Sequence, residues 1–194
     1  MRKIGLIAAL MMTLLLSGCG GGEEQKALDA ALTIRSEFLA LPGFSTQAEL
    51  TADYGQRVYD YTLDLSANEV ETLLTVREPE LVAGITARIR ADSGFLEYDG
   101  LCLETGPLTD DGLTPLSAIP AMLDAVRGAY ILSCGFEDDG TLRVDYGDPD
   151  ATPDNGTCFT LRFDPEIHDP ICGEVTSDGY LRITCTFSLF QRSQ

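Results

Sequence analysis

This chain of 194 residues is poor in positive charge and contains one histidine and no tryptophan. Its 13 Lys and Arg residues stand against 31 Asp and Glu residues, which gives a formal net charge of −18 at pH 7. A surface of that charge repels phosphate groups, so nucleic acid and anionic lipid head groups are both poor partners. A solvated surface is the favoured interpretation of the acidity, and attraction of cations or basic peptides is the alternative.

The sequence also lacks the patterns of metal sites and of common catalytic centres. There is no Cys-x-x-Cys pair and the single histidine is His168, so a metal cluster is not expected. His168 lies in an acid-rich turn without a Gly-x-Ser-x-Gly frame elsewhere, and we interpret it as a solvated loop residue. The acidic run 148–156 departs from EF-hand spacing, because its sixth position is not glycine and no glutamate closes it. We predict no catalytic residue, no metal, no cofactor and no enzymatic activity.

No apolar run is long enough to remain as a transmembrane helix. Residues 4–16 form an apolar run of 13 residues behind Arg2 and Lys3, whereas a permanent span needs about 20. The run ends in Leu16-Ser17-Gly18-Cys19, which resembles the lipobox of bacterial lipoproteins in order and position.

That resemblance implies cleavage between Gly18 and Cys19 and acylation of the Cys19 thiol, with palmitate or similar chains. Several acyl chains would hold the protein stably on the extracytoplasmic face of a bacterial cell membrane. An ordinary secretory signal and a retained membrane anchor are the alternatives. The predicted division is a signal peptide at 1–18, the lipidated cysteine with a flexible tether at 19–26, and one domain at 27–194. Loss of the two basic residues with the signal moves the net charge from −18 to −20.

Hydrophobic periodicity predicts two helices among many strands. Residues 23–41 repeat apolar side chains at helical spacing and stop at Pro42. Residues 114–127 do the same, with Thr114 as the N-cap and Pro115 in the first turn. From Phe44 onward the period is otherwise two. Strands are predicted at 58–65, 70–76, 81–89, 95–103, 130–137, 141–146, 157–163, 171–176 and 180–190.

The last two strands can be joined in two ways. A three-residue loop at 177–179 puts Val175 opposite Leu181, whereas a two-residue loop sets Glu174 against a buried Ile183. We favour the three-residue loop, because it keeps apolar side chains on one face. The whole pattern predicts one α+β domain with nine or ten sequential antiparallel strands. So long a sheet curls, which indicates a half-barrel, or unclosed barrel, with two helices covering its concave face.

The order of elements resembles the LolA/LppX-like lipoprotein-carrier superfamily: a lipobox, an N-terminal helix, a long meander and a mid-chain helix before the last strands. Residues 80–86, 94–100 and 114–116 are similar to stretches of small lipoproteins of Gram-positive bacteria. The resemblance implies an unclosed barrel whose concave face holds acyl chains. Family members that shuttle lipoproteins are soluble, whereas this chain is expected to be anchored, which argues against a shuttle.

Two function classes follow for a membrane-anchored, non-enzymatic envelope lipoprotein. In the first, the half-barrel forms a cup that binds a lipid, an acyl chain or another apolar ligand, or an envelope protein. In the second, a structural or protein-interaction lipoprotein has a filled core and no small-molecule ligand. The first predicts a continuous apolar cavity lined by Tyr61, Leu63, Leu74 and Ile85, and the second predicts a packed interior.

Five cysteines follow Cys19, an odd number in an exported chain, where disulfides form. Strand parity puts Cys158 and Cys172 on the polar face of neighbouring strands and nearly opposite each other. We predict a Cys158–Cys172 disulfide, provided that the cross-strand geometry suits the bond. Cys134 and Cys185 share faces with apolar residues and are predicted to be small core residues.

Overall fold

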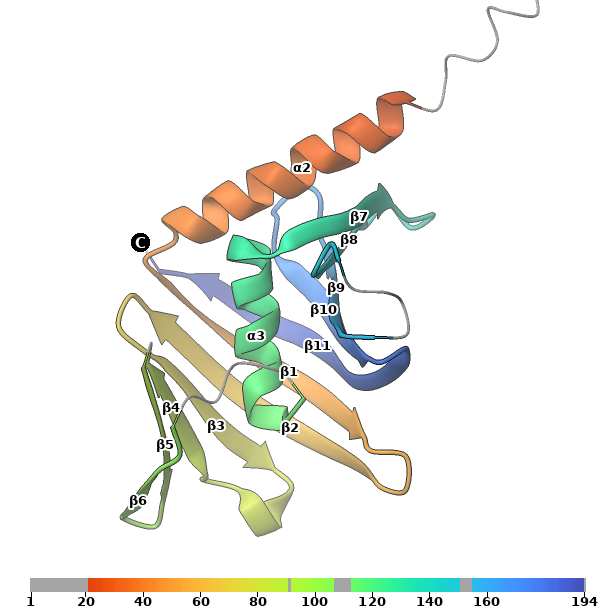
Figure 1. Ribbon diagram of the computed structural model, residues 1–194. Coiled ribbons are helices and arrows are strands. Elements are labelled where there is room, and N and C mark those ends of the chain that lie inside the picture. Colours follow the sequence, from red (N-terminus) through yellow and green to blue (C-terminus); the bar gives the residue numbers. More distant parts are fainter. Residues whose placement is uncertain (1–20, 91, 107–112, 151–154, 194) are drawn as a thin grey trace, which may run out of the picture.

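The computed structural model describes residues 21–90, 92–106, 113–150 and 155–193. One long antiparallel sheet curves around one helix, and a second helix lies along the β7 side of the sheet (Figure 1). The helices are α2 (Gly21–Ala40) and α3 (Pro115–Gly128), with a short 3₁₀ helix η1 (Glu80–Val82). The strands are β1 (Gly43–Asp53), β2 (Val58–Asn68), β3 (Thr72–Glu78), β4 (Thr86–Arg90), β5 (Ser93–Tyr98), β6 (Leu101–Glu104), β7 (Tyr130–Phe136), β8 (Leu142–Gly147), β9 (Thr157–Phe163), β10 (Pro170–Ser177) and β11 (Tyr180–Arg192).

The strand order is β6-β5-β4-β3-β2-β1-β11-β10-β9-β8-β7. Two meanders therefore run outward from the centre, where β1 pairs antiparallel with β11. The edge strands β6 and β7 are not paired with each other in the described part of the chain, so the sheet is a half-barrel with a concave side, the trough. The predicted α+β half-barrel is confirmed, with eleven strands rather than nine or ten.

The N-terminal helix α2 forms as predicted and packs along the β7 side of the trough. Its buried residues recur at helical spacing: Ala27, Ala31, Ile34 and Phe38. The helix begins at Gly21, so residues 21–26 are helical and the flexible tether predicted at 19–26 is wrong over that stretch. Cys19 lies outside the described residues.

The second helix, α3, begins at the predicted cap. The Thr114 hydroxyl accepts a hydrogen bond from the Ser117 N–H, and the Ser117 hydroxyl accepts one from the Thr114 N–H, both at 3.1 Å. This capping box satisfies two N–H groups that a helix start leaves without intrahelical partners. Pro115 is tolerated directly after this cap, because the first helical residue needs no N–H.

The two helices hold each other by their C-terminal ends. Arg35 of α2 donates from Nε to the Val126 carbonyl at 2.8 Å and from Nη2 to the Ala129 carbonyl. In return, Arg127 of α3 donates to the Phe38 carbonyl at 3.3 Å. Each arginine thus brings positive charge to the negative end of the other helix dipole, which fixes the angle between the helices.

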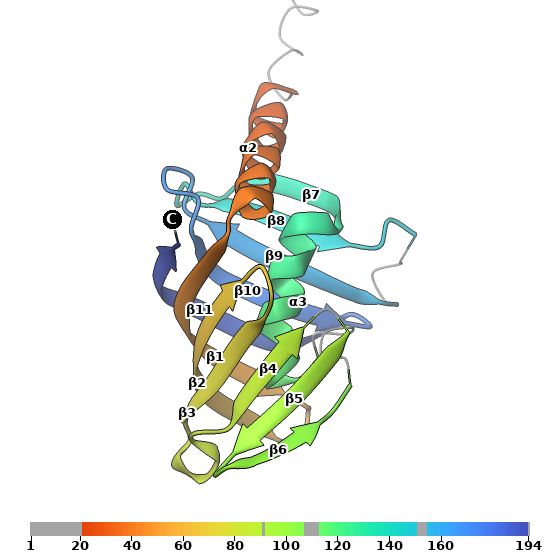
Figure 2. The ribbon, with the colours of Figure 1, turned by 90° about the vertical axis from the view of Figure 1, so that its left-hand side faces the viewer.

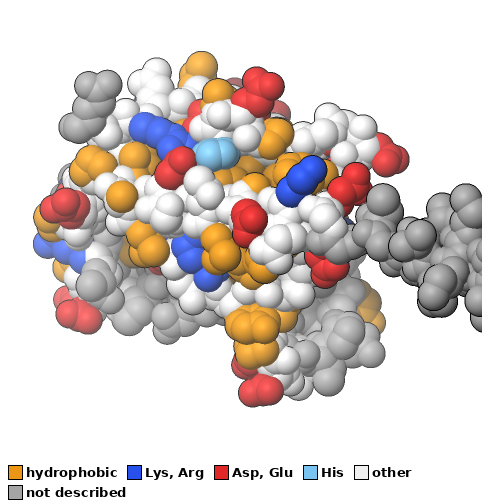
Figure 3. Space-filling view, turned by 90° about the horizontal axis from the view of Figure 1, so that it is seen from above, with side chains coloured by type: hydrophobic (Ala, Val, Ile, Leu, Met, Phe, Trp, Pro, Cys, Tyr) orange, Lys and Arg blue, Asp and Glu red, His pale blue; other side chains and the backbone are white. Residues whose placement is uncertain are grey.

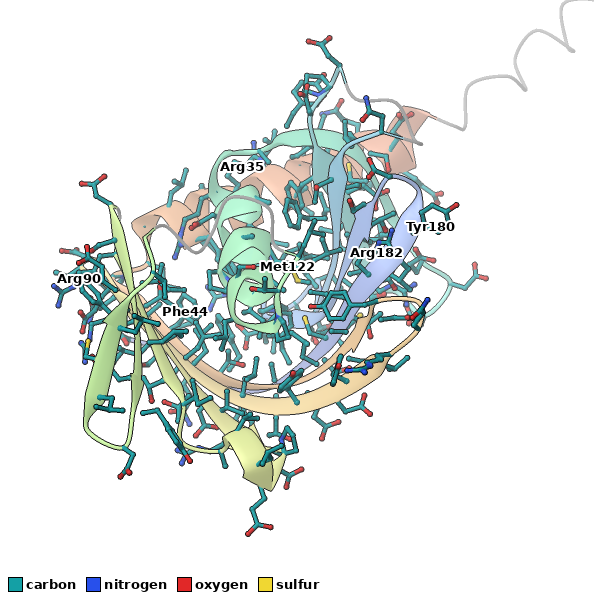
Figure 4. The ribbon with its side chains drawn as sticks, turned by 60° about the horizontal axis from the view of Figure 1, so that its bottom comes forward. Arg35, Phe44, Arg90, Met122, Tyr180 and Arg182 are labelled. Atoms are coloured by element: carbon teal, nitrogen blue, oxygen red, sulfur yellow. The ribbon has the colours of Figure 1, made fainter. Side chains whose placement is uncertain are left out.

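The helix α3 fills the trough. Nine of its residues are buried: Ser117, Ala118, Ile119, Pro120, Ala121, Met122, Leu123, Ala125 and Val126. A surface helix buries only one stripe, so burial on nearly all sides marks α3 as a central core element. The Met122 Sδ lies 3.6 Å from the Cys185 Sγ, and a Cβ added to Gly173 would come within 2.5 Å of it. Figure 4 shows Met122 within the curve of the sheet and Arg90 outside it.

Two predicted strands are wrong in their extent. The strand predicted at 81–89 begins only at Thr86, because Pro79 lacks an N–H and Gly84 has a positive φ of 90°, so the chain bends through η1 first. The strand predicted at 95–103 is the β5–β6 hairpin. It turns at Asp99 and Gly100, whose φ values are 48° and 78°, a pair of positive φ values that suits a tight hairpin turn.

The three-residue loop predicted between the last two strands is wrong, as the β10–β11 hairpin shows. Its turn contains two residues, 178–179, and not the three at 177–179. A bulge then shifts the register by one residue, which puts Val175 opposite Ile183 and leaves Glu174 opposite Thr184. Val175 and Ile183 are both fully buried. The bulge therefore restores the apolar pairing that the longer loop was expected to provide.

Candidate functional site

The four predicted cup residues lie on the concave face, but the chain itself occupies the space in front of them. Leu63 and Leu74 are fully buried, and Tyr61 and Ile85 are partly buried against the same core. Leu63 lies on β2 and Leu74 on β3, and both face into the hydrophobic core that α3 completes. In this structure Leu63, Leu74 and Ile85 pack against protein, whereas Tyr61 packs against the same core and also borders a hollow of about 510 Å³.

One part of the concave face is uncovered, at the β6 end of the sheet. We call it the open rim and define it as Tyr98, Leu101 and Leu103, which are 49%, 76% and 64% exposed. These residues continue the buried concave face, because Leu103 lies opposite Leu96, and Leu96 lies opposite the buried Ala87. Exposed apolar side chains that continue a core face mark a candidate contact surface.

The open rim is exposed because the sheet extends beyond its covering helix. The helix α3 packs mainly on β1 and on β8 to β11, and β5 and β6 lie on the other side of the trough. Figure 2 shows these two strands at the end of the molecule farthest from α2. The alternation of apolar residues along 96–103 is visible in the sequence. The position of α3, which leaves these residues uncovered, is not visible there.

The convex face carries polar hollows. One of about 510 Å³ lies over the middle of the sheet. Its side-chain lining includes Glu49, Thr51, Asp60, Thr62, Thr184 and Thr186. A second, of about 350 Å³, lies over β7 to β9 and contains Asp145. That carboxylate accepts hydrogen bonds from Ser133 and Thr160 and pairs with Arg143, so its hydrogen-bonding capacity is used within the chain.

The predicted Cys158–Cys172 disulfide is wrong. Both thiols are free, since Cys172 lies opposite Arg162 and Cys158 lies opposite Thr176. The two cysteines are therefore offset by four positions, about 13 Å at about 3.3 Å per residue, which no disulfide can span. Burial raises the pKa of both thiols, so neither is an activated nucleophile.

The other two cysteine predictions agree better with the structure. Cys185 is buried beneath α3, and Cys134 is partly buried against the same core. Burial raises the pKa of each thiol, as expected for a small core side chain.

The prediction that His168 is a solvated loop residue is wrong. His168 belongs to a half-buried ionic cluster. Its Nδ1 lies 2.9 Å from the Glu37 Oε1 on α2. Arg192 donates from Nη1 to the Glu37 Oε2 at 2.9 Å and from Nε to the Asp169 Oδ1 at 3.1 Å. Figure 3 shows the histidine next to acidic and basic side chains. The cluster joins α2, the β9–β10 turn and the end of β11.

The charge balance of this cluster favours an ionised Glu37. Partial burial by itself would raise the pKa of Glu37, but hydrogen bonds from Arg192 and His168, together with their charges, lower it on balance. The three side chains therefore hold one another and clamp the C-terminal half of α2 onto the sheet. We assign the cluster a structural role.

The described residues contain no group of three or more His, Cys, Asp or Glu side chains that could hold a metal ion. The acidic run 148–156 is described only at its ends, because 151–154 lie outside the described residues. Of the helices in the described ranges, none combines the length and apolar character that a membrane span requires. The predicted cleavage site, Gly18 and Cys19, also lies outside them.

No family model matches the chain, and no curated protein is similar to it in sequence. Several solved structures share its fold. A domain from Vibrio parahaemolyticus, described as an outer membrane lipoprotein-sorting protein, is 12% identical, with 88% of this chain and 94% of that chain covered and a TM-score of 0.51. A DUF1329 family protein from Desulfovibrio piger is 10% identical, with 88% and 93% covered and a TM-score of 0.50.

A LolA superfamily protein from Nitrosomonas europaea is 12% identical, with 89% of this chain and 94% of that chain covered and a TM-score of 0.46. Identities this low concern the fold alone, and of these three structures the first two, with TM-scores of 0.51 and 0.50, carry the likeness in fold. They show that this chain shares the fold of the lipoprotein-sorting domain and of the DUF1329 family protein, with an eleven-stranded unclosed sheet and two helices.

Proposed function

We propose that this protein is a non-enzymatic lipoprotein of the bacterial cell envelope, anchored through Cys19, that binds a protein partner at its surface. The observation that carries the proposal is the filled trough. Where a lipid-enclosing protein needs a hollow, this chain places α3, with Met122 against the inner face of the sheet. Two titratable groups with several partners, Glu37 and Asp145, are engaged in contacts that hold the fold.

The anchor is proposed from residues 1–22 of the sequence. Acyl chains on Cys19 would lie two residues before Gly21, the first described residue of the 20-residue helix α2. Such a helix is about 30 Å long. The proposed division keeps the signal peptide at 1–18 and the lipidated Cys19, with the folded domain joined to the anchor by α2.

Opening the trough for an acyl chain would be costly. The helix α3 would have to leave the sheet and expose its buried apolar side chains. For Ile119, Met122, Leu123 and Val126 together the cost is about 6–12 kcal/mol, at about 1.5–3 kcal/mol for each side chain. That is comparable with the whole stability of a typical domain, about 5–15 kcal/mol. A filled interior is therefore the stable arrangement of this chain.

A second candidate is binding of a lipid, an acyl chain or another apolar ligand. The LolA-like fold and the open rim favour it, because the rim presents apolar side chains without a covering helix. The Vibrio parahaemolyticus domain is described as a lipoprotein-sorting protein, and we propose a related role for this chain only as this second candidate.

A fluorescent fatty acid separates the two candidates. We expect no saturable binding when it is titrated into residues 19–194 carrying Cys19→Ala, because α3 occupies the trough. The same titration of Met122→Ala, which removes buried volume from the trough, controls for the sensitivity of the probe. Saturable one-to-one binding to the unmodified interior would overturn the filled-trough proposal and support the apolar-ligand candidate.

The anchor has its own test. We expect the full chain, expressed in a bacterium fed radioactive palmitate, to incorporate the label, and Cys19→Ala to lose essentially all of it, because the thioether can form only at that thiol. The matched control is Cys102→Ala, which removes an exposed cysteine of the folded domain and should leave labelling unchanged. Equal labelling of Cys19→Ala and the unsubstituted chain would contradict the anchor.

A further inference from the structure

The edge strand β6 offers main-chain hydrogen-bonding groups that no other strand of the described chain uses. It pairs with β5 on one side only and is the last strand of the sheet. All four of its residues are exposed. The opposite edge, β7, lies along α2 and carries a register shift, both of which protect an edge from pairing. In the ranges that the structure describes, β6 has neither protection.

The hairpin geometry identifies the groups that face outward. A two-residue turn with positive φ at Asp99 and Gly100 closes on a hydrogen-bonded pair, Tyr98 and Leu101. Antiparallel strands alternate, so Leu101 and Leu103 direct their main-chain groups to β5, and those of Cys102 and Glu104 point to the free edge. The hydrogen bond from the Thr105 N–H to the Gly94 carbonyl, at 2.8 Å, follows the same alternation.

The two faces of β6 differ in chemistry. On the concave side lie Leu101 and Leu103, which form the open rim with Tyr98. On the convex side lie Cys102 and Glu104. The hairpin segment 93–106 contains three acidic residues and no Lys or Arg. Glu97 is paired with Arg88 at 3.0 Å, whereas Asp99 and Glu104 have no ion-pair partner among the described residues. A strand that suits this edge is therefore apolar toward the trough and basic on its other face.

The edge also lies far from the proposed anchor. The N-terminus of α2 and the strand β6 are at opposite ends of the molecule in both views (Figures 1 and 2). A chain held at the membrane through Cys19 would thus present β6 away from the bilayer, where an extracytoplasmic protein can reach it.

We propose that β6 binds an extended segment of another extracytoplasmic protein as a twelfth strand of the sheet. The segment alternates apolar side chains, which contact the open rim, with basic side chains, which face the carboxylate of Glu104 on the convex side. Strand addition of this kind takes affinity from main-chain hydrogen bonds and specificity from alternate side chains. The proposal rests on the proposed function and names its partner class and site.

The test uses a fluorescein-labelled peptide of nine residues in which leucine alternates with lysine, followed by fluorescence anisotropy, with a scrambled peptide of the same composition as the control. We expect saturable binding of the alternating peptide alone. Cys102→Pro should weaken it at least about tenfold, since proline removes an outward N–H that β5 does not need. The matched variant Cys102→Ser keeps that N–H and should bind as the unsubstituted protein does. Leu103→Ser, which removes rim contact, should also weaken binding.

Circular dichroism confirms that each variant is folded. Failure of the unsubstituted protein to bind the peptide, or equal binding by Cys102→Pro and Cys102→Ser, would overturn the strand-addition proposal. So would a dimer, measured by light scattering, that Cys102→Pro dissociates, because a second copy would then occupy the edge. Fatty acid binding by the same preparation would instead overturn the filled-trough function, so the two failures are distinguishable.

Discussion

Replacing Phe38 with alanine is expected to lower the free energy of unfolding by about 3–5 kcal/mol. Phe38 is only 1% exposed, at the point where α2 meets the sheet. Its ring meets Phe163 edge-on with centroids 6.2 Å apart and lies 6.1 Å from Phe190. The substitution leaves a cavity between the helix and two strands, and the aromatic contacts around it are lost together with the buried area.

The neighbouring residue supplies the control. Leu39 lies on the same helix and is 63% exposed, so Leu39→Ala should change stability by less than about 0.5 kcal/mol. Urea denaturation followed by circular dichroism gives both values. Equal destabilisation by the two substitutions would mean that α2 does not dock on the sheet through its Phe38 face.

Replacing Met122 with aspartate is expected to cost more than about 4 kcal/mol and to prevent stable folding. The Met122 side chain is fully buried against Cys185 and the main chain at Gly173. A carboxylate at that position would be buried without a positively charged partner. This substitution therefore probes the interior of the trough directly.

Asp124 on the same helix is the matched position. It is exposed and pairs with Arg127 at 3.0 Å, a surface ion pair, so Asp124→Asn should cost less than about 1 kcal/mol. Thermal unfolding of both variants is the measurement. A Met122→Asp protein that keeps the stability of the unsubstituted chain would show that the trough holds water, and the filled interior would then be wrong.

The helix α3 determines which parts of the concave face remain accessible in this half-barrel. The connection between the two sheet edges, β6 and β7, contains α3, which lies on the concave side. The chain thus supplies its own occupant for the surface on which an apolar ligand could lie. What is left uncovered is the open rim, and that surface adjoins a free strand edge suited to a protein segment.

Much of the fold could be predicted from the sequence, because the signals that specify it are local. The period of two, the helical spacing before Pro42 and the Thr114 cap each concern side chains a few residues apart. These determine which stretches are strands and which are helices. The length of the strand series then implies curling, and the half-barrel follows.

The errors have a different origin. The disulfide prediction depended on the register of β9 and β10, which places Cys158 and Cys172 at different heights. The loop prediction at 177–179 failed because a bulge can change a register without a longer turn. His168 was misjudged because its partner Glu37 is 131 residues away in the sequence. No local pattern marks such an ion pair.

By itself the sequence determined the types of the elements, their order and the acidic character of the surface, and it predicts the anchor at Cys19. Whether the concave face is a cup or a core depends on the tertiary structure alone. Leu63 and Leu74 would look the same in the sequence whether they faced a lipid or a helix. What distinguishes the two cases is where α3 lies relative to strands some 50 residues earlier in the chain, and that position is set by packing across the whole molecule.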